Sequence, residues 1–185
     1  MTTSDDVLRI LDLLHAAGVD VWLDGGWGVD ALLREQTRPH DDLDIAMKHE
    51  DASNFMRALG EAGFGLLPGG TAMNFVVMDG GGSKVDVHLV DVHADRLNDQ
   101  GMQIYGPNGL EYEVGSLAGH GVVSGRPVPC CTAEFQIKSH AGYELDENDF
   151  RDVMALCRRF GLALPQALNH EVRSKEQESE VRWEQ

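Results

Sequence analysis

Apolar residues recur at helical spacing in five stretches of the chain. The first stretch begins at Ser4, an oxygen-bearing cap, with acidic residues in its first turn. Its apolar period continues until Gly18, which predicts an amphipathic helix. The same period predicts further helices over residues 27–34, 51–62, 132–143 and 146–160. In the last of these, the predicted inner face is formed by Val153, Leu156, Cys157 and Phe160.

Strands are predicted where apolar and polar residues alternate. The expected strands cover residues 19–23, 42–47, 72–78 and 84–90. The last two are separated by a glycine-rich turn, so we expect them to form an antiparallel hairpin. Residues 101–129 are rich in glycine and proline, which predicts loops with one or two minor strands. After Asn169 the chain is polar and rich in glutamate, which is typical of a solvated helix or a frayed tail.

The order of these elements favours an α+β fold in which helices back a mixed β-sheet. A length of 185 residues is typical of one compact unit, either alone or with a small appendage. We therefore expect a core with the mixed sheet over residues 1–131. A short C-terminal helical region with a polar tail is expected over residues 132–185.

The chain is strongly acidic, with a formal net charge of −16 at pH 7. Such a surface repels phosphate backbones and anionic membranes, so no stable nucleic acid partner and no membrane partner is expected. It favours cationic small molecules and metal ions, although acidity also serves solubility alone. The three cysteines lack a C-x-x-C spacing, and the chain shows neither a secretion signal nor a long apolar run. These features favour a reduced, cytoplasmic setting.

Three aspartates are candidate metal ligands. Asp42 and Asp44 are two residues apart in a predicted strand and therefore project from the same side. Adjacent carboxylates repel each other unless a cation or basic neighbours compensate them, and oxygen ligands select hard ions such as Mg²⁺. Asp86 lies mid-strand between core-type residues, where its burial requires compensation. A solvated strand edge explains each acid on its own, so the prediction depends on their combination.

A glycine turn lies between the strand at 19–23 and the helix that follows. Because no side chains are in the way, the backbone amides of Gly25, Gly26 and Trp27 are able to approach an anion at a helix start. A triphosphate fits this arrangement. A Gly-Gly pair taken alone is more often a plain tight turn, so the succession of the turn and the acids carries the prediction.

The ordered set of motifs resembles the small antibiotic nucleotidyltransferases of the polymerase-β-like superfamily. The residues that carry this resemblance are Gly25-Gly26-Trp27, the block from Thr37 to Asp44, Asp86, His140, Gly142, Tyr143, Asp149 and Asp152. The run from Trp22 to Asp30 is similar to the opening of the short lincosamide nucleotidyltransferases, and aminoglycoside 2''-adenylyltransferases share a looser version. The resemblance spans most of the chain, from Val7 to Phe160, and implies the polymerase-β-like nucleotidyltransferase fold.

The resemblance also implies roles for the matching residues. Those expected to be catalytic and to bind metal are Asp42, Asp44 and Asp86. Those expected to bind the nucleotide are Gly25, Gly26, Trp27, Arg38 and Lys138. Those expected to orient these groups or to contact substrate are His40, His88 and Tyr143, and a purely structural His40 stays open.

The resemblance implies a Mg²⁺-dependent transfer of a nucleoside monophosphate onto a hydroxyl of a small cationic antibiotic. The expected donor is ATP, which supplies AMP, or another NTP. Two Mg²⁺ ions would clamp the reacting phosphate, and pyrophosphate would leave. The expected acceptor is a lincosamide such as lincomycin or clindamycin, and the outcome is drug resistance. Because the C-terminal part is short, we expect a homodimer to complete the acceptor pocket.

Other interpretations stay open. In the first, the acceptor of the nucleotide is an aminoglycoside. In the second, the acceptor is a protein or a metabolite, as in toxin–antitoxin systems. A noncatalytic nucleotide-binding relative is a third, although such a module has little reason to crowd three acids. A fourth is a metal-dependent hydrolase using Asp86, His88 and His93.

Overall fold

The computed structural model describes residues 1–92, 96–97, 103–104, 112–140 and 145–165. Its centre is a seven-stranded mixed sheet with the order β3-β4-β5-β2-β1-β9-β8, and β6 and β7 form a separate two-stranded sheet. The strands are β1 Val21–Leu23, β2 Asp42–Lys48, β3 Gly65–Leu66, β4 Asn74–Met78, β5 Lys84–Val90, β6 Arg96–Leu97, β7 Gln103–Ile104, β8 Gly119–Val123 and β9 Arg126–Cys130. The helices are α1 Ser4–Ala16, α2 Gly25–Leu33, η1 His49–Asp51 (3-10), α3 Ala52–Glu61, α4 Ala133–Ser139 and α5 Glu147–Phe160. The predicted α+β fold with a mixed sheet is confirmed.

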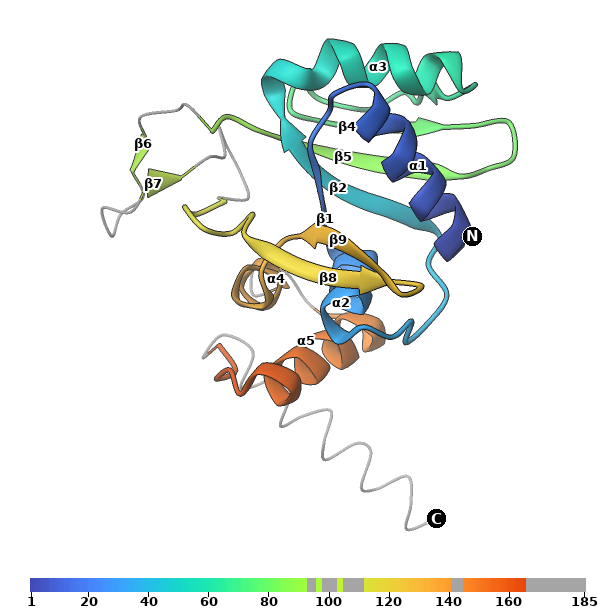
Figure 1. The fold of residues 1–185 in the computed structure, drawn as a ribbon. Helices are drawn as coiled ribbons and strands as arrows, with labels where there is room; N and C mark the ends of the chain where they lie inside the picture. The colour runs from blue at the N-terminus through green and yellow to red at the C-terminus, as the bar shows by residue number, and fades with distance from the viewer. Residues whose placement is uncertain (93–95, 98–102, 105–111, 141–144, 166–185) are drawn as a thin grey trace.

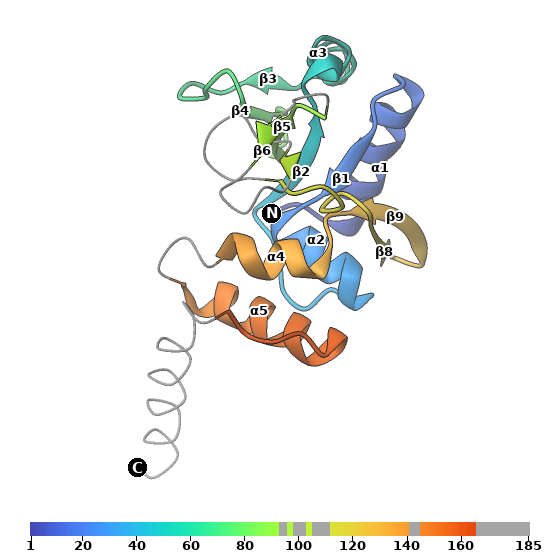
Figure 2. The ribbon, with the colours of Figure 1, turned by 90° about the vertical axis from the view of Figure 1, so that its left-hand side faces the viewer.

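The helices divide into two groups along the sheet. Figures 1 and 2 show α1 and α3 together at the end that holds β4 and β5, and α2, α4 and α5 together near β8 and β9. The alternation of apolar and polar residues predicted for β2 explains which face of this strand packs against helices. Leu43, Ile45 and Met47 are fully buried in the main core, which also contains the apolar faces of α1 and α3. Asp42 and Asp44 therefore project from the opposite face.

The first helix begins at the predicted residue, but its cap is one position earlier. Thr3 has an extended backbone, and its side-chain oxygen accepts a hydrogen bond from the Asp6 amide at 3.2 Å. The Asp6 carboxylate accepts in return from the Thr3 amide at 3.0 Å, which completes a capping box. Ser4 is the first helical residue instead of the cap, because the reciprocal pair requires a spacing of three.

The strands β4 and β5 form the predicted antiparallel hairpin. On its other side, β5 pairs in parallel with β2, and this register brings two of the candidate acids together. Asp44 lies directly opposite Asp86, and Asp42 lies opposite Lys84. Neighbouring strands in a sheet are about 4.8 Å apart, so carboxylates in register on one face are close neighbours.

The glycine-rich segment over residues 101–129 was predicted to form loops with one or two minor strands, and the main-sheet strands β8 and β9 lie at its end. β8 and β9 form a hairpin whose turn uses positive φ at Ser124 and Gly125. A Cβ at Gly119 would lie 2.5 Å from the carbonyl oxygens of Cys130 and Cys131, and one at Gly121 would lie 2.5 Å from the backbone of Ala31 in α2. These glycines therefore allow close packing. The two strands in this segment are confirmed, but they belong to the main sheet and are not minor elements.

Two prolines limit how β9 joins the rest of the sheet. The Cys131 amide donates to the Leu23 carbonyl at 2.8 Å, so that amide faces β1. Because successive amides alternate sides, the nitrogens of Pro127 and Pro129 face β1 as well, and neither carries a hydrogen. In the described chain β1 and β9 accordingly pair at one position, Leu23 with Cys130. The hairpin is thus attached to the sheet at its end nearest α2.

Gly121→Ala is expected to destabilise the protein by about 2 kcal/mol, because the added methyl group would overlap the backbone of α2. Gly60→Ala is a matched control, since its Cβ would meet nothing within 4 Å inside helix α3. This control is expected to leave stability unchanged or to raise it by about 0.5 kcal/mol. Urea unfolding of both variants measures the difference, and equal effects would contradict the packing argument.

Two details of the C-terminal part differ from the predictions. Helix α4 ends at Ser139, and residues 141–144 lie outside the described chain. Val153 and Leu156 are buried as predicted, whereas Phe160 is 45% exposed because the last turn of α5 extends beyond the core. The polar tail after Asn169 also lies outside the described residues, and the division at residues 131 and 132 stays a prediction. In the described residues, no helix combines the length and apolar character that crossing a membrane requires.

Candidate active site

Two of the predicted acids and one histidine converge on the open face of β2 and β5. One ligand atom from each of Asp44, Asp86 and His88 lies within 4.8 Å of the others, and all three side chains are half-buried. His88 Nε2 is 3.9 Å from Asp44 Oδ1 and 4.0 Å from Asp86 Oδ1. Asp42 lies two residues before Asp44 on the same face of the strand. The structure thus brings together the three predicted acids and His88.

The electrostatics of this group reflect crowding of negative charge. Burial raises the pKa of Asp42, and the carboxylates of Asp44 and Asp86 raise it further. Burial also raises the pKa of Asp86, an effect that His88 opposes and Asp44 reinforces. Burial alone would lower the pKa of His88, but its contact with Asp44 and the nearby acids outweigh this, so that pKa is raised. A divalent cation would relieve the same repulsion.

A fourth carboxylate, which the sequence did not single out, lies beneath this group. Asp24 is 6% exposed and caps α2, where one of its oxygens accepts from the Gly25 amide at 2.9 Å. Its other oxygen accepts from the Tyr112 hydroxyl at 2.8 Å. Burial raises the pKa of Asp24, and Asp44 adds to the increase while His88 and Tyr112 oppose it. Tyr112 in turn stacks on Phe135 of α4, with ring centroids 4.5 Å apart.

The predicted glycine turn is the first turn of α2 and touches the acids directly. Gly25 has a φ of +52°, and a Cβ at this position would lie 2.3 Å from Asp44 Oδ2. The amides of Gly26 and Trp27 donate to no acceptor in the described chain, as expected at a helix start. The Trp27 ring is buried in the core with its centroid 4.9 Å from that of His40. Only the backbone of Trp27 is therefore able to meet a ligand.

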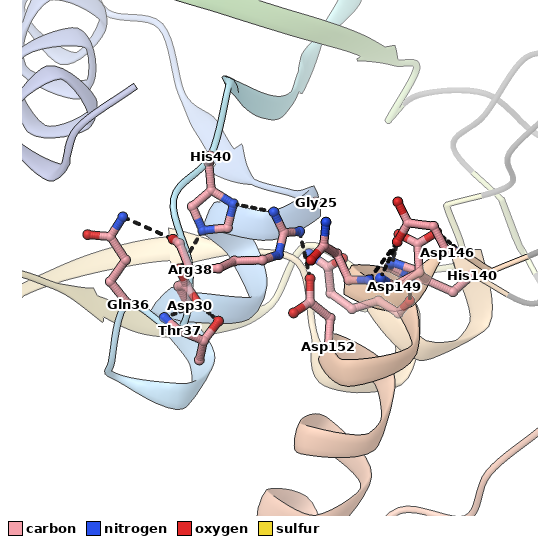
Figure 3. A network of polar contacts seen from close by, with 12 residues as sticks. Gly25, Asp30, Gln36, Thr37, Arg38, His40, His140, Asp146, Asp149 and Asp152 are labelled. Atoms are coloured by element: carbon pink, nitrogen blue, oxygen red, sulfur yellow. Dashed lines mark hydrogen bonds and ion pairs between the residues drawn. The ribbon is translucent and has the colours of Figure 1, made fainter. Parts of the chain in front are cut away.

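Arg38 and His40 belong to a buried polar chain that runs beside this turn (Figure 3). Arg38 Nη1 donates to His40 Nδ1 at 3.0 Å, and the other ring nitrogen of His40 lies 2.5 Å from Asp30 Oδ2. Asp30 Oδ1 accepts from the amide and the hydroxyl of Thr37. At its other end Arg38 donates to Asp152 of α5 at 2.9 Å. His40 is 4% exposed, so it acts on a ligand only through Arg38 or the turn.

The remaining predicted residues lie apart from the acids or outside the described chain. Lys138 is on an exposed position of α4, and its ammonium group forms an ion pair with Glu113. No contact joins it to the carboxylates of β2 and β5 in the described chain. Tyr143 and His93 are not among the described residues.

Sequence reasoning gave Asp24 and Asp30 no part in this site, and it considered Tyr112 for stacking on a sugar or drug without predicting its contact with Asp24. A weak signal existed for the first two, because both belong to the run from Trp22 to Asp30 that carries the family resemblance. Asp24 also stands directly before the glycine pair, where a cap is expected. Nothing near Tyr112 distinguishes it, since its partner Asp24 is 88 residues away in the chain.

Comparisons with known proteins show the family to which this chain is similar. The family model described as aminoglycoside-2''-adenylyltransferase matches residues 6–156. A lincosamide resistance protein of Staphylococcus haemolyticus is 30% identical over 170 residues, which cover 83% of this chain and 94% of that protein. A 2''-aminoglycoside nucleotidyltransferase of Escherichia coli is 31% identical over 132 residues, which cover 66% and 63%.

Two solved structures share the fold. The lincomycin-bound crystal structure of the lincosamide antibiotic adenylyltransferase LnuA superposes with a TM-score of 0.68 at 29% identity, over 84% of this chain and 96% of that one. The crystal structure of ANT(2'')-Ia in complex with adenylyl-2''-tobramycin superposes with a TM-score of 0.65 at 20% identity, over 85% and 89%.

Proposed function

Because the chain belongs to the aminoglycoside-2''-adenylyltransferase family and is a nucleotide-transferring enzyme, we propose that it moves AMP from ATP onto a hydroxyl of a lincosamide. The register of Asp44 with Asp86, with Gly25 packed against the Asp44 carboxylate, is the observation that carries this proposal. It sets crowded acids beside a helix start, which is the combination that a metal-bound triphosphate requires. Inactivation of the drug and resistance of the host would follow.

Each residue has a defined part in the proposed transfer. The acceptor hydroxyl oxygen bonds to the α-phosphorus, the bond to the β-phosphate bridging oxygen breaks, and pyrophosphate leaves. Asp86 accepts the hydroxyl proton. The amides of Gly26 and Trp27 donate to the phosphates, and Arg38 adds positive charge at the same turn. Lys138 would take part only by exchanging Glu113 for a phosphate oxygen.

The donor set fits a hard divalent cation. Asp42, Asp44 and Asp86 supply carboxylate oxygens. Burial raises the pKa of Asp42 and Asp86, neighbouring carboxylates raise it further, and such an ion would neutralise this repulsion. We propose Mg²⁺ at these residues, two ions as in two-metal phosphoryl-transfer sites, where the metal polarises the reacting phosphate. His88 lies within reach of the same position and would help to hold Asp44 and Asp86 in place.

The aminoglycosides are the second candidate class of acceptor. The family model and the Escherichia coli relative favour them, whereas the lincosamide relative matches over more of this chain, 83% against 66%. Both classes carry protonated amines, and the net charge of −16 suits either one. We therefore place the lincosamides first on the extent of similarity. A cytoplasmic homodimer remains part of the proposal, since it would add walls to the acceptor site.

Incubation with ATP, Mg²⁺ and either lincomycin or kanamycin tests the proposal. Lincomycin is expected to gain the mass of one AMP with release of one pyrophosphate, and kanamycin is expected to stay unmodified. Mass spectrometry of the drugs and a pyrophosphate assay provide the readout, with a chelator as the control. Modification of kanamycin alone would support the second candidate. ATP cleavage with neither drug modified would contradict both and favour hydrolysis or another acceptor.

A further inference from the structure

Asp152 of α5 and Arg38 form an ion pair between segments 114 residues apart in the chain. The Asp152 side chain is only 6% exposed, and that of Arg38 is 24% exposed. Helix α5 is held independently of this pair, because Val153 and Leu156 bury its apolar face in the main core. An ion pair at this depth is therefore not needed to attach the helix, and burial of both charges has an unfavourable desolvation cost.

The guanidinium group of Arg38 lies against the first turn of α2. A Cβ at Gly26 would be 3.0 Å from Arg38 Nη2, the nitrogen that donates to Asp152. Arg38 Nη1 is occupied by His40, and Arg38 Nε is buried without a partner in the described chain. His40 and Asp152 thus hold the guanidinium group from two sides (Figure 3). The Arg38 side chain therefore lies closer to the turn than a residue with a Cβ at position 26 would allow.

We propose that Asp152 is a positioning residue for the nucleotide: through Arg38, it holds a fixed positive charge beside the Gly25-Gly26 turn, where the triphosphate of the NTP would bind. Without Asp152, Arg38 keeps one anchor, His40, and its planar group is free to turn away from the turn. Prepositioned charge binds phosphate more tightly than a mobile side chain, because no conformational freedom is lost on binding. This inference rests on the proposed nucleotidyltransfer, and its test separates the two.

Asp152→Ala is expected to raise the KM and the Kd for the NTP about tenfold, the equivalent of losing one charge-assisted hydrogen bond. The kcat value and the KM for the acceptor are expected to change by less than about twofold, because Asp152 does not touch the reacting atoms. Asp152→Asn keeps the shape and one acceptor oxygen, so it is expected to fall between the wild type and Asp152→Ala. Titration calorimetry and steady-state kinetics provide the two readouts.

Two further variants make the test specific. Arg151→Gln alters the exposed neighbour of Asp152 on α5, whose surface pair with Glu147 contributes little, and it is expected to behave like the wild type. Arg38→Gln is expected to raise the NTP KM as Asp152→Ala does, and the double variant is expected to add no further increase. Full additivity of the two changes would show that Asp152 does not act through Arg38 and would overturn the inference.

The remaining outcomes are equally decisive. A lower melting temperature with an unchanged NTP KM in both Asp152 variants would assign the ion pair to stability alone and overturn the inference while the proposed function stands. Tighter NTP binding in Asp152→Asn would mean that Asp152 competes with phosphate for Arg38, which also overturns it. A wild-type protein that binds no NTP would reject the proposed function and the inference together.

Discussion

Asp44→Ala is expected to reduce nucleotide transfer by at least about 10³-fold, because loss of a carboxylate that we propose to bind metal would remove several kcal/mol of transition-state stabilisation. Asp44 is the acid that contacts the most of the site: it opposes Asp86, lies 3.9 Å from His88 and packs against Gly25. Burial raises the pKa of Asp24, Asp42 and Asp86, and the charge of Asp44 raises each of them further. Steady-state assays of AMP transfer measure the loss.

The same variant is expected to unfold at the same temperature as the wild type or higher in the absence of metal. Removing Asp44 relieves the repulsion among the remaining acids, and active sites often sacrifice stability in this way. Asp41→Ala is the matched control, since Asp41 is exposed and stands immediately before β2. Retained transfer in Asp44→Ala would remove the metal assignment, and a large fall in melting temperature would show that the acid is a structural group.

Gly25→Ala is expected to lower transfer about 100-fold, because its methyl group would lie 2.3 Å from Asp44 Oδ2 and displace that carboxylate. The left-handed backbone at Gly25, with φ +52°, adds about 1 kcal/mol of strain to any residue with a Cβ. Transfer assays and thermal unfolding, measured together, separate the two effects.

Gly18→Ala isolates the backbone contribution. Gly18 has a φ of +71°, but a Cβ there would meet nothing within 4 Å. This variant is expected to lose a similar amount of stability from strain while it retains full transfer. If Gly25→Ala transferred AMP at the rate of Gly18→Ala, the close approach of Gly25 to Asp44 would have no functional meaning.

Local patterns predicted the parts of the fold that depend on neighbours in the chain. The β4–β5 hairpin follows from alternation around a glycine-rich turn, and the apolar side of β2 follows from its period of two. The pair Asp42 and Asp44 follows from the same period. The glycine turn of α2 was recognisable as well, because it stands between a strand and a helix.

Contacts between distant segments were beyond such patterns. The parallel register of β2 with β5 joins Asp44 to Asp86, which are 42 positions apart in the chain, and no local pattern predicted this register. The ion pair of Arg38 with Asp152 has no local trace, since each residue alone is typical of a solvated surface. Composition predicted mainly loops where β8 and β9 lie. The alternate glycines of β8 allow close packing on α2, and the alternate prolines of β9 limit its pairing with β1.

β9 joins β1 through one residue pair, Leu23 with Cys130, and through the hydrogen bond that the Cys131 amide donates to the Leu23 carbonyl. Leu23 stands immediately before Asp24, and Cys131 stands two residues before the start of α4. The contact that completes this end of the sheet therefore also sets the beginning of α4 beside the buried carboxylate of Asp24, to which the hydroxyl group of Tyr112 donates.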